Sequence, residues 1–265
     1  MEQALYVSKV ENLKYFSKDF TRLYFGQEFC EKLIPTEEQL EEVLSFVEKE
    51  SLNFTFVTPY VTNHGLERLE DQIGFLGKRK PDAEIVFNDW GVFQFLREAW
   101  PGLTPVMGRL LNKMKRGPRI MNILDKVPRE TRDFFQGSNL DVPAVGRFLK
   151  SRGISRVEFD NLLQGITLEG ADKEIHKSLY MPFVFVSTTR FCLSANCDSR
   201  QKSDYVGIGA CGRECQKYTF NLENPVMKLP LIRKGNAIFF LNENIPDVVS
   251  NRSVDRIVIE PEIPI

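Results

Sequence analysis

Short apolar stretches recur along the whole chain, and helical or loop sequence separates them. Each is nearly continuously apolar and ends in polar or turn residues, a pattern typical of strands buried on both faces of a parallel sheet. They lie at residues 22–26, 54–60, 84–89, 104–108, 156–161, 182–191, 237–243 and 255–261. Roughly eight βα-like units in one chain indicate an α/β fold of the TIM-like (β/α)-barrel type, regular or distorted. A doubly wound open sheet is the alternative.

Amphipathic helices are predicted between several of these stretches. The clearest begins at a capping box formed by Thr36 and Gln39. Apolar residues then follow at the spacing of one helical face, namely Leu40, Val43, Leu44 and Val47. Further helices are expected over residues 65–81, 91–100 and 142–153, the last of them ending at Gly153.

The composition is that of an ordinary globular protein. Hydrophobic residues make up 42% and charged residues 27% of the 265 residues, with a net charge of −1. This charge argues against bulk electrostatic capture of nucleic acid, although a local basic patch remains compatible with it. We see neither a secretory signal nor an apolar run of the ~18 residues that a membrane span needs. We therefore expect a single domain over residues 1–265, without a membrane span, in a reducing cytoplasm.

Four of the five cysteines lie in one segment, residues 192–222, which is rich in Gly, Ser and Asp and interrupts the βα alternation. We predict it to be a loop insertion after the sixth strand that binds a metal or a cluster. The spacing is Cys192-x4-Cys197-x13-Cys211-x3-Cys215. A structural zinc fits these two close pairs, while an iron–sulfur cluster or inert buried thiols remain alternatives. Nearby cations could offset thiolate charge, namely Arg190, Arg200, Lys202, Arg213 and Lys217.

Three patches resemble, in order, motifs of the collagenase-like peptidase family U-32. They are "LYFGQEFC" at residues 23–30, "FNDWGV" at 87–92, and "VSTTRFC" at 186–192 followed by "GACGREC" at 209–215. The cysteine pattern is most similar to that of the oxygen-independent ubiquinone-hydroxylation accessory proteins in this family. The likeness spans about residues 20–220.

The resemblance implies a (β/α)-barrel with a [4Fe–4S] cluster held by four cysteines at its catalytic mouth. This chain has five cysteines, so two quartets are possible. One is Cys192, Cys197, Cys211 and Cys215; the other combines Cys30 with Cys211, Cys215 and either Cys192 or Cys197. In a barrel, Cys30 would lie at the C-terminal end of its strand, on the face that carries chemistry. Zinc remains the alternative to the cluster.

Polar residues at predicted strand ends form a second group of candidates, because barrel enzymes place catalytic groups there. Glu28 and Asp89 are the predicted catalytic residues, since both lie inside the resembling patches. The other members of the set are Asn88, Glu158, Asp160, Asn161 and Glu243. His64 and His176 are the only histidines, and we expect both at the surface. The basic stretch at residues 108–119 could bind a phosphate or RNA, or it could be a solvated face.

The resemblance therefore implies an iron–sulfur protein that acts in oxygen-independent hydroxylation, or in related redox chemistry. The resemblance implies an aromatic quinone precursor or RNA as the substrate. One alternative is a non-catalytic, metal-stabilised accessory subunit that works with a paralogous subunit. The other is a peptidase, which no recognisable nucleophile–base pair or histidine zinc site supports.

Overall fold

Eight parallel strands close into a barrel in the computed structural model, which describes residues 1–199 and 210–265. Around the barrel the order is β1-β2-β3-β4-β5-β6-β7-β12, and β12 pairs with β1 to close it. The strands are β1 (Glu2–Val7), β2 (Arg22–Gly26), β3 (Asn53–Val57), β4 (Glu84–Phe87), β5 (Thr104–Met107), β6 (Arg156–Asp160), β7 (His176–Met181) and β12 (Arg256–Ile259). The predicted barrel is thus confirmed, and its closure excludes the open doubly wound sheet.

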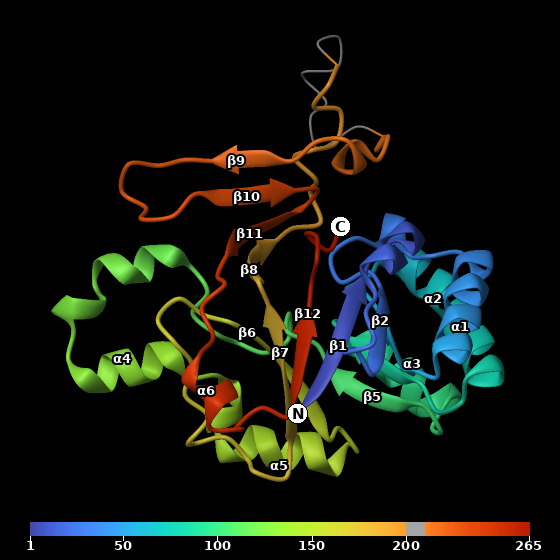
Figure 1. Cartoon of the computed structure of the whole chain (residues 1–265), viewed down its shortest axis with the longest axis horizontal. Helices are drawn as coiled ribbons and strands as arrows, with labels where there is room; N and C mark the ends of the chain where they lie inside the picture. Colours follow the sequence, from blue (N-terminus) through green and yellow to red (C-terminus); the bar gives the residue numbers. More distant parts are fainter. Residues whose placement is uncertain (200–209) are drawn as a thin grey trace.

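Helices cover the outside of the barrel, most regularly over its first half (Figure 1). They are α1 (Glu37–Glu50), α2 (Asn63–Arg79), α3 (Trp90–Ala99), α4 (Arg129–Gln136), α5 (Pro143–Ser151) and α6 (Asp247–Ser250). The capping box at the start of α1 is confirmed: the Thr36 hydroxyl accepts from the Gln39 backbone N–H, and the Gln39 side-chain oxygen accepts from the Thr36 backbone N–H. The buried face of α1 is the predicted apolar stripe. None of the helices in the described part of the chain has the length and apolar character needed to cross a membrane.

A second, four-stranded antiparallel sheet lies outside the barrel. Its order is β8 (Phe183–Thr188), β11 (Ala237–Leu241), β10 (Leu231–Lys234) and β9 (Phe220–Leu222). It is inserted between β7 and β12, and it lies above the end of the barrel toward which the parallel strands run (Figure 1). The small sheet therefore covers part of the C-terminal face, where barrel proteins place their functional groups.

Two strand assignments from the sequence are corrected here. Residues 182–191 and 237–243 are not barrel strands, because they contain β8 and β11, which pair antiparallel with each other in the small sheet. The two remaining barrel strands are β1 and β7. The sequence pattern did not predict them, because each begins with polar residues. The cysteine segment does follow the strand that we counted sixth, but that strand lies outside the barrel. Residues 200–209 of the predicted insertion, with Arg200 and Lys202, lie outside the described residues.

The barrel interior is polar at both ends and aromatic between them. Within an interior cluster, Tyr180 packs edge to face against Tyr6 and Tyr24, and the rings of Tyr6 and Tyr24 are tilted relative to each other. At the N-terminal end, Arg256 bridges Glu2 and Glu84. The C-terminal end is filled by a buried group of charges centred on Arg109. The main hydrophobic core lies instead between the barrel and the surrounding helices.

Candidate functional site

Four cysteines from three separate parts of the chain line one cavity of about 250 Å³. Cys30 follows β2, Cys192 follows β8, and Cys211 and Cys215 belong to the segment that leads into β9. The cavity lies at the C-terminal ends of β2 and β3, against the turn between β10 and β11. Its remaining walls include Phe29, Leu33, Tyr60, Gly235 and Asn236.

The chain positions Cys30 by burying the residues immediately before it. The Gln27 side chain donates to the Ser8 carbonyl, and Glu28 points into the buried charge cluster. Phe29 is fully buried and packs against Phe185 and Phe239 of the small sheet. These contacts anchor the residues before Cys30 to the barrel and to the small sheet. The Cys30 thiol therefore faces the cavity, which residues on both sides line.

The turn between β10 and β11 lies against Cys215 and against the segment that follows Cys192. Gly235 adopts φ +59°, and a Cβ placed there would lie 3.3 Å from the Cβ of Cys215. The Ser194 hydroxyl donates to the Gly235 carbonyl at 3.0 Å, which ties the segment after Cys192 to the same turn. Cys215 and the segment that follows Cys192 are therefore held at the tip of one hairpin.

Cys197 is the cysteine that does not line this cavity. It is half-buried and lies beyond Cys192 in the same turn-rich segment. Of the two quartets that the sequence allowed, the structure brings together the one that contains Cys30, with Cys192 in preference to Cys197. The identity of the ligands stays a prediction.

Burial and local cations set the electrostatics of the cavity. Burial raises the pKa of the Cys30 thiol to about 11, and it also raises the pKa of Cys192 and Cys215. Lys32, Arg190 and Arg213 line the same cavity. These cations can offset the charge of thiolates once a ligand replaces the thiol protons.

Nitrogen donors reach two of the sulfurs directly. The backbone N–H of Arg213 donates to the Cys211 Sγ at 3.3 Å, and the Gln216 side chain donates to the Cys215 Sγ at 3.6 Å. Burial is the larger influence on Cys215 and raises its pKa, while the hydrogen bond from Gln216 acts in the opposite direction. Among the residues outside 200–209, however, no three Cys, His, Asp or Glu side chains are grouped closely enough to hold a single metal ion.

Glu28 is fully buried in an ion cluster and does not line the cysteine cavity. Arg109 bonds Glu28 at 2.6 Å, Asp160 at 3.1 Å and Glu260 at 2.5 Å, and all four side chains are 0% exposed. Burial raises the pKa of Glu28 and of Glu260. The Arg109 guanidinium also stacks 4.0 Å from the Tyr180 ring centroid. Sequence reasoning missed the roles of Arg109 and Glu260, because Arg109 looked like one cation of an exposed basic run.

Asp89 caps helix α3, and it also fixes the loop that carries Tyr60. Its Oδ1 accepts from the Gly91 backbone at 2.7 Å, and its Oδ2 accepts from the Val61 backbone at 3.2 Å. The neighbouring Asn88 is buried and donates to the Thr58 carbonyl. Asp89 therefore holds one wall of the cavity in place through the backbone rather than by lining it.

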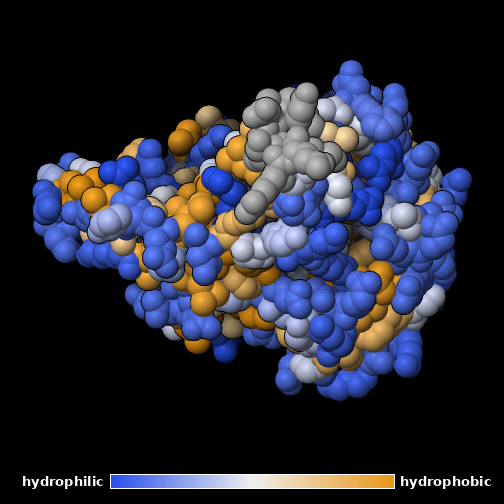
Figure 2. Space-filling view, turned by 90° about the horizontal axis from the view of Figure 1, so that it is seen from above, coloured by the Kyte–Doolittle hydropathy of each residue, from blue (hydrophilic) through white to orange (hydrophobic). Residues whose placement is uncertain are grey.

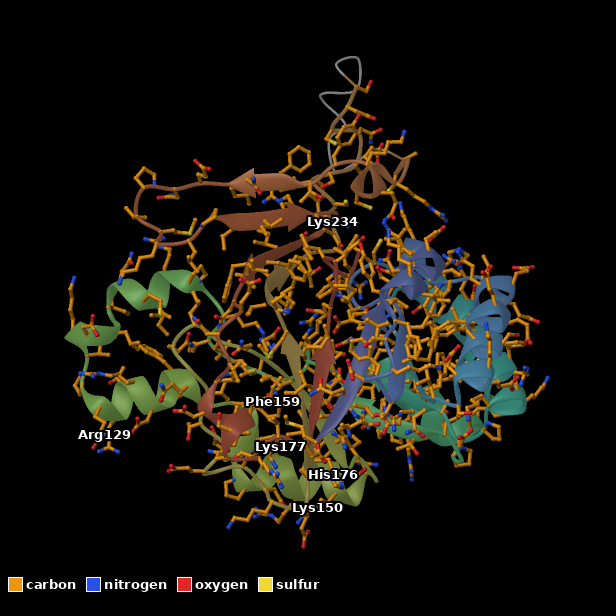
Figure 3. All side chains as sticks on the ribbon, viewed as in Figure 1. Arg129, Lys150, Phe159, His176, Lys177 and Lys234 are labelled. Atoms are coloured by element: carbon orange, nitrogen blue, oxygen red, sulfur yellow. The ribbon has the colours of Figure 1, made fainter. Side chains whose placement is uncertain are left out.

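The remaining candidates are dispersed. His64 is exposed and pairs with Glu67, and His176 pairs with Asp255 at the end of the barrel opposite to Lys234 of β10 (Figure 3). Both histidines are at the surface, as expected. Glu158 and Asn161 are buried, whereas Glu243 is exposed. In the basic stretch, Arg109 and Arg116 are buried and the other cations are exposed.

Comparisons with known proteins report on the fold. No protein-family model matches the sequence, and no curated protein matches it. Among solved structures, a U32 peptidase is similar over 99% of this chain and 93% of its own, with a TM-score of 0.50 and 11% identity. A glycoside hydrolase family 18 N-acetylglucosaminidase from Paenibacillus barengoltzii covers 97% and 94%, with a TM-score of 0.41 and 10% identity. The first likeness agrees with the closed (β/α)-barrel described above.

Proposed function

We propose that this chain is an iron–sulfur protein of the collagenase-like peptidase family U-32. In this proposal Cys30, Cys192, Cys211 and Cys215 hold a [4Fe–4S] cluster at the C-terminal face of the barrel. The protein acts in oxygen-independent hydroxylation or related redox chemistry, in the reducing cytoplasm. Its substrate is an aromatic quinone precursor or RNA, as the sequence resemblance implies.

One observation carries the proposal: four thiols from distant parts of the chain line a single cavity. Cys30 and Cys211 are separated by most of the barrel sequence, so no local turn requirement explains why they meet. Four cysteine thiolates are the usual ligand set of a cubane cluster. The cations that line the same cavity suit a group of net negative charge.

The size of the cavity favours a cluster over a single zinc ion. Zinc holds its four sulfurs about 2.3 Å from one point, so a zinc site is compact. Among the described residues no three ligand side chains converge closely enough to hold a single ion, and the cavity that the four thiols line together with other residues measures about 250 Å³. A single water needs only about 10–15 Å³ by the same measure. A polynuclear group fills a cavity of this volume better than a single ion does.

The three resembling patches all contribute to one face of the fold. "LYFGQEFC" is β2 with its extension to Cys30, and "FNDWGV" joins β4 to α3. The third patch supplies the other cavity cysteines. Similarity to a U32 peptidase structure supports the family at the level of the fold.

A cluster with four protein thiolates supplies one-electron transfer. The chain's own side chains bind and shield it. The cavity cysteines supply the ligands, and Phe29 and Leu33 present apolar surface that limits water. Arg190 and Arg213 place positive charge beside the thiolates.

Iron content after single substitutions tests the ligand set. We expect Cys30→Ala, purified without oxygen, to lose most of its iron and sulfide and the broad visible absorption of a cluster. Cys197→Ala is the matched control, and it should keep the iron content of the unchanged protein. Zinc without iron in the unchanged protein would overturn the proposal, and loss of iron in Cys197→Ala but not in Cys30→Ala would overturn the assignment of ligands.

The buried position of Glu28 favours a second candidate, a metal-stabilised accessory subunit that works with a paralogous subunit. The barrel mouth, where enzymes of this fold place catalytic groups, is filled here by the Arg109 cluster. Co-purification with a homologous chain, together with inactivity of this chain alone, would support this candidate. A peptidase is less favoured, because neither histidine lies at the cysteine cavity.

A further inference from the structure

A second groove, of about 560 Å³, adjoins the cysteine cavity on the C-terminal face. One wall is the segment after β5, and the opposite wall is β8 with its continuation to Arg190. Tyr60 and Arg190 line both the groove and the cavity. A molecule in the groove would therefore share these two side chains with the cysteine site.

Tyr60 is held rigidly in this dividing position. Its hydroxyl shares a hydrogen bond of 3.0 Å with Thr188 and accepts one of 3.0 Å from Asn236. The Arg190 guanidinium lies 5.8 Å from the Tyr60 ring centroid and donates to the Val61 carbonyl. Hydrogen bonds between the loop after β3 and the residues of and around the small sheet therefore hold Tyr60 and Arg190 between the groove and the cavity.

The groove combines apolar surface with positive charge. Its apolar lining comes from Leu110, Met114, Phe185 and Val186. Its cations are Lys113, Arg116 and Arg190, and none of the described residues that line it carries a carboxylate. This charge asymmetry contrasts with the net charge of −1 for the whole chain.

Two of the three cations are available to a ligand. Arg116 is buried and already bonds Asp160 at 2.5 Å, together with the carbonyls of Arg109 and Asn112. In the described part of the chain, no carboxylate pairs with Lys113 or with Arg190. An anion entering the groove would therefore meet, on both walls, a cation that no described carboxylate pairs with.

We propose that this groove binds a small amphipathic anion, with an apolar or aryl body against Leu110, Met114 and Phe185 and a carboxylate or phosphate between Lys113 and Arg190. The inference rests on the proposed function, because it makes this anion the molecule on which the cysteine site acts. The volume lies within the range of small-molecule sites, about 300–1,000 Å³. Charge-assisted bonds to both cations would fix its orientation.

The apolar surface continues away from the cysteine site. Lys113 and Met114 also line a neighbouring hollow with Phe134 and Val142, whose side chains are exposed. Figure 2 looks onto this face and shows hydrophobic surface extending toward the part of the molecule that carries α4. A ligand with an extended apolar body would find a path there while its charged group stays beside Arg190.

Titration calorimetry with benzoate and phenyl phosphate as probes tests the site. Binding by the unchanged protein should weaken about tenfold in Lys113→Ala and in Arg190→Gln, since each loses one charge-assisted hydrogen bond. Lys115→Ala is the matched control, because Lys115 is an exposed neighbour that does not line this groove. It should bind both probes as the unchanged protein does. The two probes distinguish a carboxylate ligand from a phosphate ligand.

Three results would overturn the inference. The first is that uncharged benzyl alcohol binds as tightly as the two anionic probes. The second is that neither Lys113→Ala nor Arg190→Gln weakens the binding of either probe. The third is that a single-stranded oligonucleotide displaces the probes at a concentration far below that at which the probes themselves bind. The same titration on Cys30→Ala, with iron measured separately, separates the two proposals. Probe binding by Cys30→Ala after the loss of its iron would establish the groove independently of the cluster. Probe binding by an unchanged protein that contains no iron would establish the groove and refute the cluster.

Discussion

Glu158 lies in the barrel interior, where its Oε2 accepts a hydrogen bond of 2.5 Å from the Tyr180 hydroxyl. Burial raises the pKa of Glu158 to about 8, and the negative charge of nearby Glu28 acts in the same direction. The folded protein therefore keeps this carboxyl protonated at neutral pH, whereas the unfolded chain ionises it. Its position at the end of an apolar stretch did not reveal this, because burial is a property of the folded structure.

This difference predicts a pH-dependent stability. Between the ordinary carboxyl pKa and about 8, the folded state binds a proton that the unfolded state releases, so Glu158 makes stability fall as pH rises through that window, on the order of 1 kcal/mol per pH unit. We expect Glu158→Gln to remove this component, since glutamine still accepts from Tyr180. Urea unfolding at pH 5, 6, 7 and 8 measures it. Parallel pH profiles for the two proteins would contradict the assignment.

At the scale of elements, the end of β2 determines where Cys30 lies. Gly26 ends the strand at φ +132°, a conformation that residues with a side chain rarely adopt. A Cβ at this position would lie 2.2 Å from the Val57 carbonyl oxygen of the neighbouring strand. Only glycine lets the chain leave the barrel here and turn toward the cavity.

Gly26→Ala is therefore expected to destabilise the fold by more than about 1 kcal/mol, because it adds both strain and a backbone clash. Gly102→Ala is the matched control: a Cβ there meets nothing within 4 Å. That change should alter stability by no more than about 0.5 kcal/mol. Urea midpoints compare the two variants, and equal midpoints would contradict the argument.

Across the whole molecule, Arg109 connects parts of the chain that are far apart in sequence. Its guanidinium bonds Glu28 after β2, Asp160 of β6 and Glu260 after β12, and it donates to the Phe183 carbonyl at the start of the small sheet. One buried cation thus connects the barrel to the first strand of the small sheet. Breaking such a cluster leaves buried carboxylates without a counter-charge.

We expect Arg109→Met to destabilise the protein on the order of 3–5 kcal/mol, because the buried network loses the cation that bridges Glu28, Asp160 and Glu260. Arg129→Met is the control, since Arg129 is 92% exposed and pairs only loosely with Asp133 (Figure 3). That substitution should change stability by less than about 0.5 kcal/mol. Thermal and urea unfolding measure the stability of both variants. A similar loss of stability in Arg109→Met and Arg129→Met would refute a central role for Arg109.

Local sequence patterns predicted the parts of the structure that local physics controls. The stripe of α1 and its capping box are periodic or adjacent in sequence, so they could be recognised directly. A continuous apolar stretch is less informative, because it indicates a buried strand but not the sheet to which the strand belongs. Residues 182–191 and 237–243 were therefore placed in the barrel, although they form the small sheet that covers it.

The sequence by itself determined that this chain folds as a (β/α)-barrel and that its cysteines are a candidate site. Only the tertiary structure decided which thiols meet: Cys30 joins Cys192, Cys211 and Cys215 around one cavity, and Cys197 does not. It also decided that Glu28 is a buried partner of Arg109. The physical reason is that strand and helix patterns arise from neighbours in sequence, whereas burial and convergence depend on how distant segments pack.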